Sequence, residues 1–421
     1  MYKKIILENG LRIILVPKKE SFSTTVLVLV GVGSDYEEKE INGVSHFLEH
    51  LCFKGTKKRP TSLDISSELD HLGAKYNAFT SNELTGYFAK ALPEHFEKIL
   101  EIISDLYLNP IFDPKEIEKE RGVIIEEINM YEDIPMQKVQ ELFTQLLYKN
   151  QPAGRPVAGT KEIIKKLSRD EIISYRQKHY LSHSTVIAVA GKINEDKAVE
   201  LVKKNFENIN QAEKEIKVPT KDIQSQPEVL IKEKNLDQTH LVLGVRAYDI
   251  FDPRRFALEL LADILGGGMS SRLFQRLREQ MGVCYYVNAA VDSSTDHGYL
   301  AISAGVDNKR LEEVIQVIIE ELNRLKTKSV KSDELQTAKN HLIGHLFLGL
   351  ESSDELAGFY GSQEVLKEEI LTPEKITQNI QAVLKENIQE VADDIFQNNK
   401  LNLALIGPIK NQEKIEKILA F

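Results

Sequence analysis

The sequence predicts an α+β fold made of two homologous α/β sandwich repeats, each an antiparallel-rich sheet covered by helices. Strand-like and helix-like patterns occur in separate blocks rather than in strict alternation, which is typical of this class. A chain of 421 residues is too long for one ordinary hydrophobic core. The pattern of the first half also starts again after about 200 residues, which indicates an internal repeat.

Composition restricts the class of protein. A hydrophobic content of 42% and a charged content of 28% are typical of a soluble globular chain. The net charge of −10 argues against nucleic acid as a partner. The two cysteines, Cys52 and Cys284, provide no disulfide framework, which fits a reducing compartment. The longest apolar run, Val26–Val32, is too short to cross a bilayer, and the chain starts without an apolar leader. We therefore expect a cytoplasmic protein without membrane association.

The elements of the first repeat follow from hydrophobic periodicity and from turn residues. Asn9 and Gly10 tolerate positive φ and predict a hairpin turn. Strands are expected at Ile5–Leu7, Leu11–Val16, Thr24–Val32, Lys75–Thr80, Thr85–Ala91 and Thr185–Ala190. Helices are expected at residues 44–53, from Thr61 or Ser62 to Gly73, from about Pro93, Pro114 and Pro135, and at residues 195–206.

The second repeat is identified by two matching segments. Gly282–Val287 matches Gly73–Ala78, and Leu403–Ile409 matches Val186–Ile193. Between the repeats the composition turns polar. The sequence therefore predicts a first domain at residues 1–210, a linker at residues 211–227 and a second domain at residues 228–421.

The segment at residues 43–53 forms a short helix with two different faces. Val44, Phe47, Leu48 and Leu51 recur at i, i+3, i+4 and i+7 and make an apolar stripe. The remaining face carries His46, Glu49 and His50. The two imidazoles lie one turn apart and can converge on one divalent ion, which suits zinc. Glu49 lies between them, where a carboxylate could take a proton from a water molecule. The order H-x-x-E-H is the inverted zinc-protease signature.

Histidines at this spacing also occur without such a carboxylate. His179 with His183, and His341 with His345, are also four residues apart, but no acid lies between either pair. We interpret both pairs as ordinary surface or core histidines. For His46–Glu49–His50 the alternative is a plain polar helix face. Setting Gly55 against Gly266 aligns these three residues with Ala257, Leu260 and Leu261, so the fold alone does not require histidines on this helix.

A catalytic zinc takes three protein ligands, one more than this helix offers. The predicted helix at residues 116–131 supplies carboxylates at Glu116, Glu118, Glu120, Glu126 and Glu127. Glu120 and Glu127 are seven residues apart and share one face, beside an apolar stripe. A carboxylate so close to the core requires a partner. The alternative for the other glutamates is a solvated helix face.

These two segments resemble the pitrilysin family of inverted zinc peptidases, over essentially the whole chain. Within that family the chain is most similar to bacterial homologues of the β subunit of mitochondrial processing peptidase, with the sandwich fold also seen in LuxS. The resemblance implies that His46, His50 and Glu127 bind one zinc ion per chain and that Glu49 is the general base. It also implies that Glu120 orients a histidine ligand from the second shell.

The resemblance extends to substrate-binding residues. Arg278 and Tyr285 match a pair that stabilises the tetrahedral intermediate in the family; the alternative is a salt-bridged surface arginine and a core tyrosine. Gly266–Gly268 is similar to a shortened glycine-rich loop, or is a plain helix end. The family's substrate-binding edge strand and its hydrophobic pocket correspond to Asn77, Ala78, Phe79, Thr80 and Phe53, although Phe53 could equally belong to the core.

Together these features predict a zinc metalloendopeptidase that hydrolyses peptides or unfolded segments. Longer family members build a closed chamber from four repeats, so the resemblance implies a homodimer here, or a heterodimer with a paralogue. Arg278 and Tyr285 would then act on the partner's zinc. The competing hypotheses are a non-catalytic partner subunit of a processing-peptidase-like complex and a zinc-containing peptide-binding module.

Overall fold

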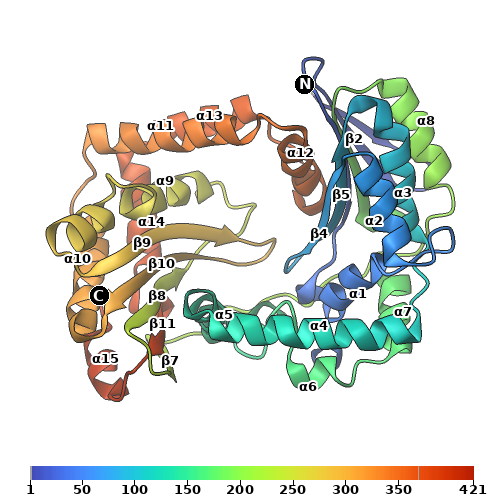
Figure 1. Cartoon of the computed structure of the whole chain (residues 1–421). Helices are drawn as coiled ribbons and strands as arrows, with labels where there is room; N and C mark the ends of the chain where they lie inside the picture. Colours follow the sequence, from blue (N-terminus) through green and yellow to red (C-terminus); the bar gives the residue numbers. More distant parts are fainter. Residues whose placement is uncertain (1, 368) are drawn as a thin grey trace. The chain divides into compact units, whose positions relative to one another are not determined.

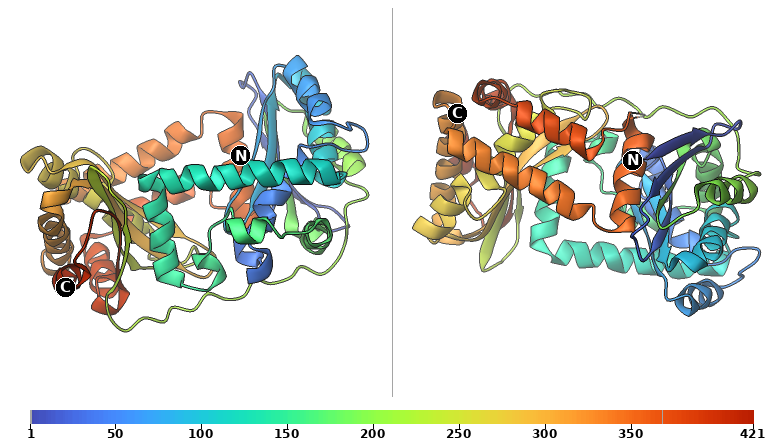
Figure 2. Two further views of the ribbon diagram at one scale, coloured as in Figure 1. Left: turned by 60° about the horizontal axis from the view of Figure 1, so that its bottom comes forward. Right: turned by 90° about the horizontal axis from the view of Figure 1, so that it is seen from above.

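The computed structural model describes residues 2–367 and 369–421 and divides into two compact units. The first unit contains Met1–Asn129, Pro156–Val218 and Leu348–Ile370. The second unit contains Met130–Arg155, Pro219–Phe347 and Leu371–Phe421. Figures 1 and 2 show the chain in three orientations, and each unit is described below by itself.

The first unit is built on a six-stranded sheet with the order β1-β2-β6-β3-β5-β4. All neighbouring strands pair antiparallel except β2 and β6, which are parallel. β4 is therefore an edge strand with one partner. The strands are β1 (Lys3–Ile6), β2 (Arg12–Pro17), β3 (Thr24–Val30), β4 (Lys75–Thr80), β5 (Thr85–Ala91) and β6 (Thr185–Gly191).

Helices cover both faces of this sheet. One face, with Ile13 and Leu15 of β2, packs against a layer of helices that includes the short α6 (Lys161–Ile164). The opposite face, with Ile14 and Val16, packs against α12 (Ser353–Lys367). Both faces are apolar because successive side chains of a strand point to opposite sides. The other helices of the first face are α1 (Val44–Cys52), α2 (Ser62–His71), α3 (Phe96–Leu108), α4 (Pro114–Asp133), α7 (Arg169–His179) and α8 (Glu195–Asn205).

The second unit repeats this plan with five strands in the order β7-β11-β8-β10-β9. Only β7 and β11 pair in parallel. The strands are β7 (Glu228–Glu233), β8 (Gln238–Arg246), β9 (Cys284–Ser293), β10 (Gly298–Asp307) and β11 (Leu401–Gly407). The helices are α5 (Pro135–Tyr148), α9 (Arg255–Gly266), α10 (Leu311–Thr327), α11 (Ser332–Gly349), α13 (Pro373–Ala382), α14 (Lys385–Ile395) and α15 (Gln412–Ile418).

The two sheets share one topology, which confirms the predicted fold class. Without its outermost strand β1, the first sheet has the same order and the same single parallel pair as the second. The matched glycines also agree in backbone conformation. Gly73 has φ +60° two residues before β4, and Gly282 has φ +61° two residues before β9. A left-handed residue is needed at both positions, and glycine adopts it without steric cost.

Two helices cross the boundaries predicted for the domains. Helix α5 lies in the first half of the sequence, but it packs on β8 and β11 of the second unit through Val139 and Phe143. Helix α12 lies in the second half, but it packs on β3 and β6 of the first unit through Ala357 and Tyr360. The predicted boundaries at 1–210, 211–227 and 228–421 thus describe the sequence repeats, whereas the compact units exchange one helix each.

The local signals at helix ends are reproduced in the structure. α4 and α5 begin at Pro114 and Pro135, where the missing N–H of proline costs no helical hydrogen bond. α2 begins after Thr61, whose hydroxyl accepts from the N–H of Asp64 while the Asp64 carboxylate accepts from the N–H of Thr61. The predicted linker at residues 211–227 contains no helix or strand.

His179 and His183 do not form a pair on one helix face. α7 ends at His179, which is buried against the rings of Tyr175 and Tyr36, whereas His183 lies in a separate short turn and is exposed. Burial lowers the pKa of His179 from 6.5 to about 4. The folded state therefore binds this proton less readily than the unfolded chain does.

Acid is consequently expected to destabilise the first unit through His179. The contribution of His179 to the free energy of unfolding is intact above about pH 6.5 and is lost as the pH falls toward 4. At pH 4.5 the loss is about 2–3 kcal/mol. Urea unfolding at pH 7.5 and pH 4.5 measures this loss. The His179→Gln protein should lose less stability over the same interval than the original protein. Equal losses in both proteins would show that His179 does not titrate in this way.

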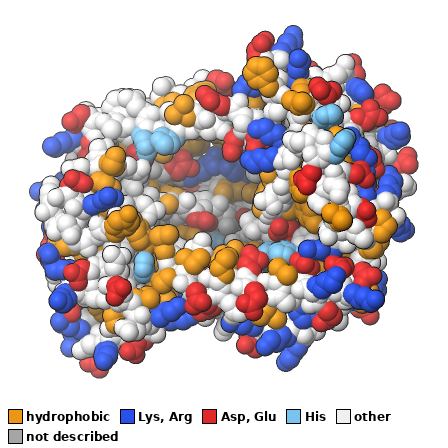
Figure 3. All heavy atoms as spheres, in the orientation of Figure 1, with side chains coloured by type: hydrophobic (Ala, Val, Ile, Leu, Met, Phe, Trp, Pro, Cys, Tyr) orange, Lys and Arg blue, Asp and Glu red, His pale blue; other side chains and the backbone are white. Residues whose placement is uncertain are grey.

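The surface carries both signs of charge. On the face drawn in Figure 3, acidic and basic side chains are interspersed rather than gathered into one basic region. None of the helices that the structure describes combines the length and the apolar composition needed to cross a membrane.

Candidate metal centre

Helix α1 is fixed at its N-terminus by a buried acid. Gly43 precedes the helix with φ +97°, a conformation that glycine adopts easily. The Glu37 carboxylate accepts from the N–H groups of Gly43 and Ser45 at 2.7 and 2.8 Å. A carboxylate at this end satisfies two otherwise unpaired donors and interacts favourably with the helix dipole. The buried apolar face of Val44, Phe47, Leu48 and Leu51 then leaves His46, Glu49 and His50 on the other side.

His46 and His50 of α1 converge on Glu127 of α4. The Nε2 atoms of His46 and His50 each lie 3.6 Å from Oε2 of Glu127. Among the residues described, these three form the one group of three or more His, Cys, Asp or Glu donors whose ligand atoms lie within 4.8 Å of one another. Two ligands about 2.0–2.1 Å from a tetrahedral zinc ion would lie about 3.3–3.4 Å apart. The donor types and their spacing therefore fit zinc.

Burial keeps His46 in the form that a metal requires. Burial, together with the neighbouring His50, lowers the pKa of His46 from 6.5 to about 4, although the Glu127 carboxylate opposes this shift. His46 is thus neutral near pH 7, and a neutral imidazole is the metal-binding form. Its Nδ1 atom is buried and has no hydrogen-bond partner within residues 2–367 and 369–421, so no side chain fixes this ring from the Nδ1 side as Glu120 does for His50.

His50 is instead oriented by a second carboxylate of α4. Oε2 of Glu120 lies 3.1 Å from Nδ1 of His50, and Oε1 lies 2.7 Å from Nζ of Lys54. Burial raises the pKa of Glu120, but the hydrogen bonds from His50 and Lys54 outweigh it and hold the pKa below its usual value. An ionised Glu120 accepts the Nδ1 proton of His50, which leaves the Nε2 lone pair directed at Glu127.

Glu49 lies on the same helix face and is held by β4. The hydroxyl of Thr80, the last residue of β4, donates to Oε2 of Glu49 at 2.5 Å. Burial raises the pKa of Glu49, and the charge of Glu127 acts in the same direction, while the Thr80 hydrogen bond opposes them. A carboxyl group with a raised pKa is closer to the value that suits proton transfer at neutral pH.

The predicted substrate-binding residues have two different environments. Asn77, Ala78, Phe79 and Thr80 lie on edge strand β4, which packs beside α1, and the Phe79 side chain is partly exposed. Phe53 follows α1, is half-buried and packs against the core, with its ring centroid 6.4 Å from that of Tyr87. The strand is therefore placed as expected, whereas Phe53 is partly a core residue.

Arg278 and Tyr285 are brought together in the second unit. Arg278 lies in a π-helical turn, Phe274–Gln280, and its guanidinium carbon is 5.8 Å from the centre of the Tyr285 ring. Tyr285 lies on edge strand β9 and is 74% exposed, so it is not the core tyrosine of the alternative interpretation. The sequence pattern did not predict the π-helical turn, a feature frequent at functional sites.

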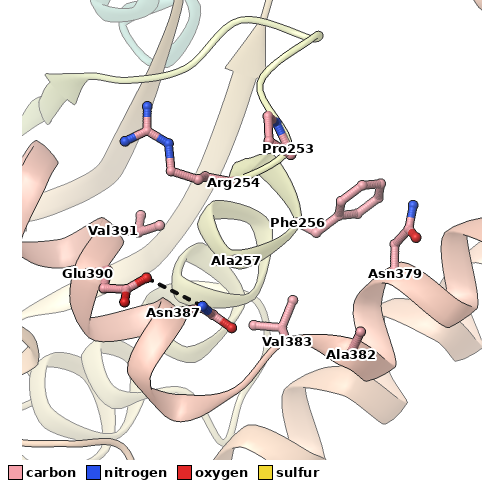
Figure 4. A pocket seen from close by; sticks show the side chains of 10 residues that line it. All are labelled: Pro253, Arg254, Phe256, Ala257, Asn379, Ala382, Val383, Asn387, Glu390 and Val391. Carbon is pink, nitrogen blue, oxygen red and sulfur yellow. Dashed lines mark hydrogen bonds between the residues drawn. The ribbon is translucent and has the colours of Figure 1, made fainter.

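The helix of the second unit that corresponds to α1 carries no metal ligands. On α9, the aligned residues Ala257, Leu260 and Leu261 are buried and apolar. The N-terminal end of α9 borders a pocket of roughly 360 Å³ (Figure 4), lined also by Arg254, Phe256, Asn379, Ala382, Val383, Asn387, Glu390 and Val391. This lining has one carboxylate and no histidine. Gly266 and Gly267 end α9, which agrees with the interpretation of this segment as a helix end.

Two residues of the site were missed at the sequence level. Lys54 lies just beyond the end of α1, where helical periodicity no longer determines the direction of a side chain. Glu37 lies in the loop before α1, and no local pattern links it to that helix. Lys54 acts on the site through its ion pair with Glu120. Glu37 acts through its hydrogen bonds to the backbone at the start of α1.

Comparison with known proteins identifies the family. Residues 12–161 match the model described as Insulinase (Peptidase family M16), and residues 166–342 match the one described as Peptidase M16 inactive domain. The chain is 36% identical to the uncharacterized zinc protease YmxG of Bacillus subtilis, covering 98% of this chain and 99% of that one. It is 34% identical to an uncharacterized zinc protease of Rickettsia felis, covering 96% of each.

A solved structure shows the same fold. The structure of a protease from Helicobacter pylori superposes with a TM-score of 0.91 at 23% identity, covering 97% of this chain and 99% of that one. The family assignment relies on the sequence matches, which extend over nearly the whole chain. The chain belongs to peptidase family M16, the insulinase family.

Proposed function

We propose that this chain is a zinc-dependent endopeptidase in which His46, His50 and Glu127 hold the metal and Glu49 transfers protons. The observation that carries the proposal is the convergence of two imidazoles and a carboxylate, whose ligand atoms lie within 4.8 Å of one another, beside the partly buried carboxyl group of Glu49. The relatives' designation as zinc proteases supports the same reaction class. When bound, zinc polarises the scissile carbonyl and lowers the pKa of water.

Side chains and backbone groups of this chain carry out proton transfer, positioning of the ligands and substrate binding. Glu49 takes a proton from the attacking water and delivers it to the leaving amine, and the hydroxyl of Thr80 fixes the orientation of its carboxylate. Glu120 holds the tautomer of His50. The free edge of β4 binds an extended peptide through backbone hydrogen bonds, which gives affinity without strict sequence preference. Peptides and unfolded segments are therefore the proposed substrates.

Loss of Glu127 is expected to remove the metal without unfolding the protein. A Glu127→Gln protein should bind zinc more weakly by more than about 100-fold, since loss of a residue that binds the metal directly costs more than loss of one that only hydrogen-bonds to a ligand, which costs about 10–100-fold. Zinc content after dialysis against a chelator measures this. The matched control is Glu126→Gln, which changes an exposed carboxylate one position away. Equal zinc retention in both proteins would remove Glu127 from the ligand set.

We further propose that Arg278 and Tyr285 stabilise the tetrahedral intermediate, and that in a homodimer they act on the partner's site. Their support is that both side chains are exposed and lie close together, Arg278 in the π-helical turn and Tyr285 on the edge strand β9. A phenol and a guanidinium aimed at a developing oxyanion are suited to this task.

Mixed dimers test action in trans. Arg278→Ala and Glu49→Gln proteins are each expected to be nearly inactive. Mixing them should restore about a quarter of the original activity, because half of the dimers are mixed and each mixed dimer has one intact combination. A protein carrying both substitutions is the control, and it should gain nothing on mixing with either parent. No recovery in verified mixed dimers contradicts action in trans.

A further inference from the structure

A second histidine pair lies on helix α11, in the second unit. His341 and His345 are four residues apart, and their ring centroids lie 4.2 Å apart at an interplanar angle of 61°. The corresponding values for His46 and His50 are 4.6 Å and 70°. The two pairs therefore present their imidazoles to one another in nearly the same way.

This pair also has a carboxylate partner that the sequence did not reveal. Oδ1 of Asp263, on α9, lies 2.6 Å from Nδ1 of His341. The Asp263 side chain is 9% exposed, whereas that of His341 is 34% exposed. Glu120 and His50 make a comparable contact, in which a largely buried carboxylate lies beside Nδ1 of one histidine, although there it is the second histidine of the pair and here it is the first.

The two helices involved correspond by their order in the repeats. α9 follows β8 as α1 follows β3, and α11 follows α10 as α4 follows α3. In the first unit α1 supplies the histidine pair and α4 the carboxylate. In the second unit α9 supplies the carboxylate and α11 the histidine pair. The combination of a histidine pair with a carboxylate at one Nδ1 thus recurs with the roles of the helices interchanged, and Asp263 corresponds to Glu120 rather than to Glu127.

We propose that His341 and His345 bind a second divalent transition-metal ion, with Asp263 as the positioning residue of His341. Because Asp263 accepts the Nδ1 proton, the Nε2 lone pair of His341 is available to a metal. His345 is exposed on the same helix face and supplies the second imidazole. Water fills the remaining coordination positions, so this site holds its ion more weakly than the site at His46.

The ligand chemistry selects the class of ion. Imidazole binds Cu²⁺, Ni²⁺ and Zn²⁺, whereas Ca²⁺ and Mg²⁺ prefer oxygen ligands. The site is reachable, because His341 borders a polar pocket of roughly 670 Å³.

Nickel titration of the full chain tests the proposal. A His46→Ala/His50→Ala protein removes the first site, so that any remaining stoichiometric binding reports on the second. We expect it to bind one Ni²⁺ per chain by isothermal titration calorimetry. Adding His341→Ala or His345→Ala should weaken binding at least tenfold, and adding Asp263→Asn should weaken it by about 10-fold or more.

His183→Ala in the same background is the matched control, since it removes an exposed histidine that shares no helix with another. It should leave the affinity unchanged. Circular dichroism of each variant checks that the fold is retained. We expect it to be retained in the His345→Ala and His183→Ala proteins, because both side chains are exposed. Copper provides a second readout: the EPR spectrum of bound Cu²⁺ should show nitrogen couplings that decrease from two to one in the His345→Ala protein. Absence of a stoichiometric site, or equal affinity in the His341→Ala and His183→Ala proteins, overturns the proposal.

Discussion

Replacing Glu49 by glutamine is expected to lower kcat for peptide hydrolysis by about 10²–10⁴-fold, the usual contribution of a general acid–base residue. Glutamine keeps the shape of the side chain and can still accept from Thr80, but it cannot take a proton from water. Glu49 is not among the three converging donors, so zinc content should stay at one ion per chain. Cleavage of a fluorogenic peptide, with zinc measured on the same sample, gives both quantities.

The Glu49→Gln result also separates the competing functions. A Glu126→Gln protein, changed at an exposed carboxylate of α4, should retain full activity. An original protein that binds zinc and peptides without cleaving them would favour the peptide-binding module. A protein without zinc and without cleavage would favour the non-catalytic partner subunit. Undiminished hydrolysis by the Glu49→Gln protein would remove Glu49 from the mechanism.

Replacing Phe143 by alanine is expected to destabilise the second unit by about 3–5 kcal/mol, the usual cost of truncating a buried phenylalanine. Phe143 is fully buried and packs among residues of β8, β10 and β11, although it belongs to the first half of the sequence. Hydrogen exchange followed by mass spectrometry measures the effect in each strand. Amides of β8 and β11 should lose protection, while those of β3 and β6 should keep theirs.

The control for this prediction lies on the same helix. Met136 is 47% exposed, so Met136→Ala should change stability by less than about 0.5 kcal/mol. Tyr360→Ala on α12 provides the reciprocal case, since this side chain packs on the sheet of the first unit. Loss of protection in β3 and β6 on replacement of Phe143 would contradict the exchange of helices between the units.

Much of the metal centre could be predicted because its parts are close in sequence and follow helical periodicity. The apolar stripe of α1 determines which face is buried, so His46, Glu49 and His50 must lie on the other. The seven-residue spacing of Glu120 and Glu127 places both carboxylates on one face of α4. The remaining step, that α4 lies against α1, came from the family resemblance, because periodicity within one helix does not identify its neighbour.

The features that could not be predicted depend on contacts between residues distant in sequence. The apolar faces of α5 and α12 show that each helix packs on something, but both sheets offer apolar surfaces, so the pattern does not select between them. Asp263 and His341 are separated by 78 residues, and their hydrogen bond is visible only in the folded chain. For the same reason the sequence alone favours ordinary surface or core histidines at His341 and His345.

X-ray absorption spectroscopy at the zinc edge can identify the residues that bind the metal, on protein loaded with one zinc ion per chain. The His341→Ala variant is used, so that only the first site contributes. We expect two imidazole nitrogens and a carboxylate oxygen at about 2.0–2.2 Å from the zinc ion. Glu127→Gln should change the oxygen contribution, and His50→Ala should change the contribution of one nitrogen. A spectrum that is the same for the Glu127→Gln protein, or one without imidazole nitrogens, would contradict this ligand set.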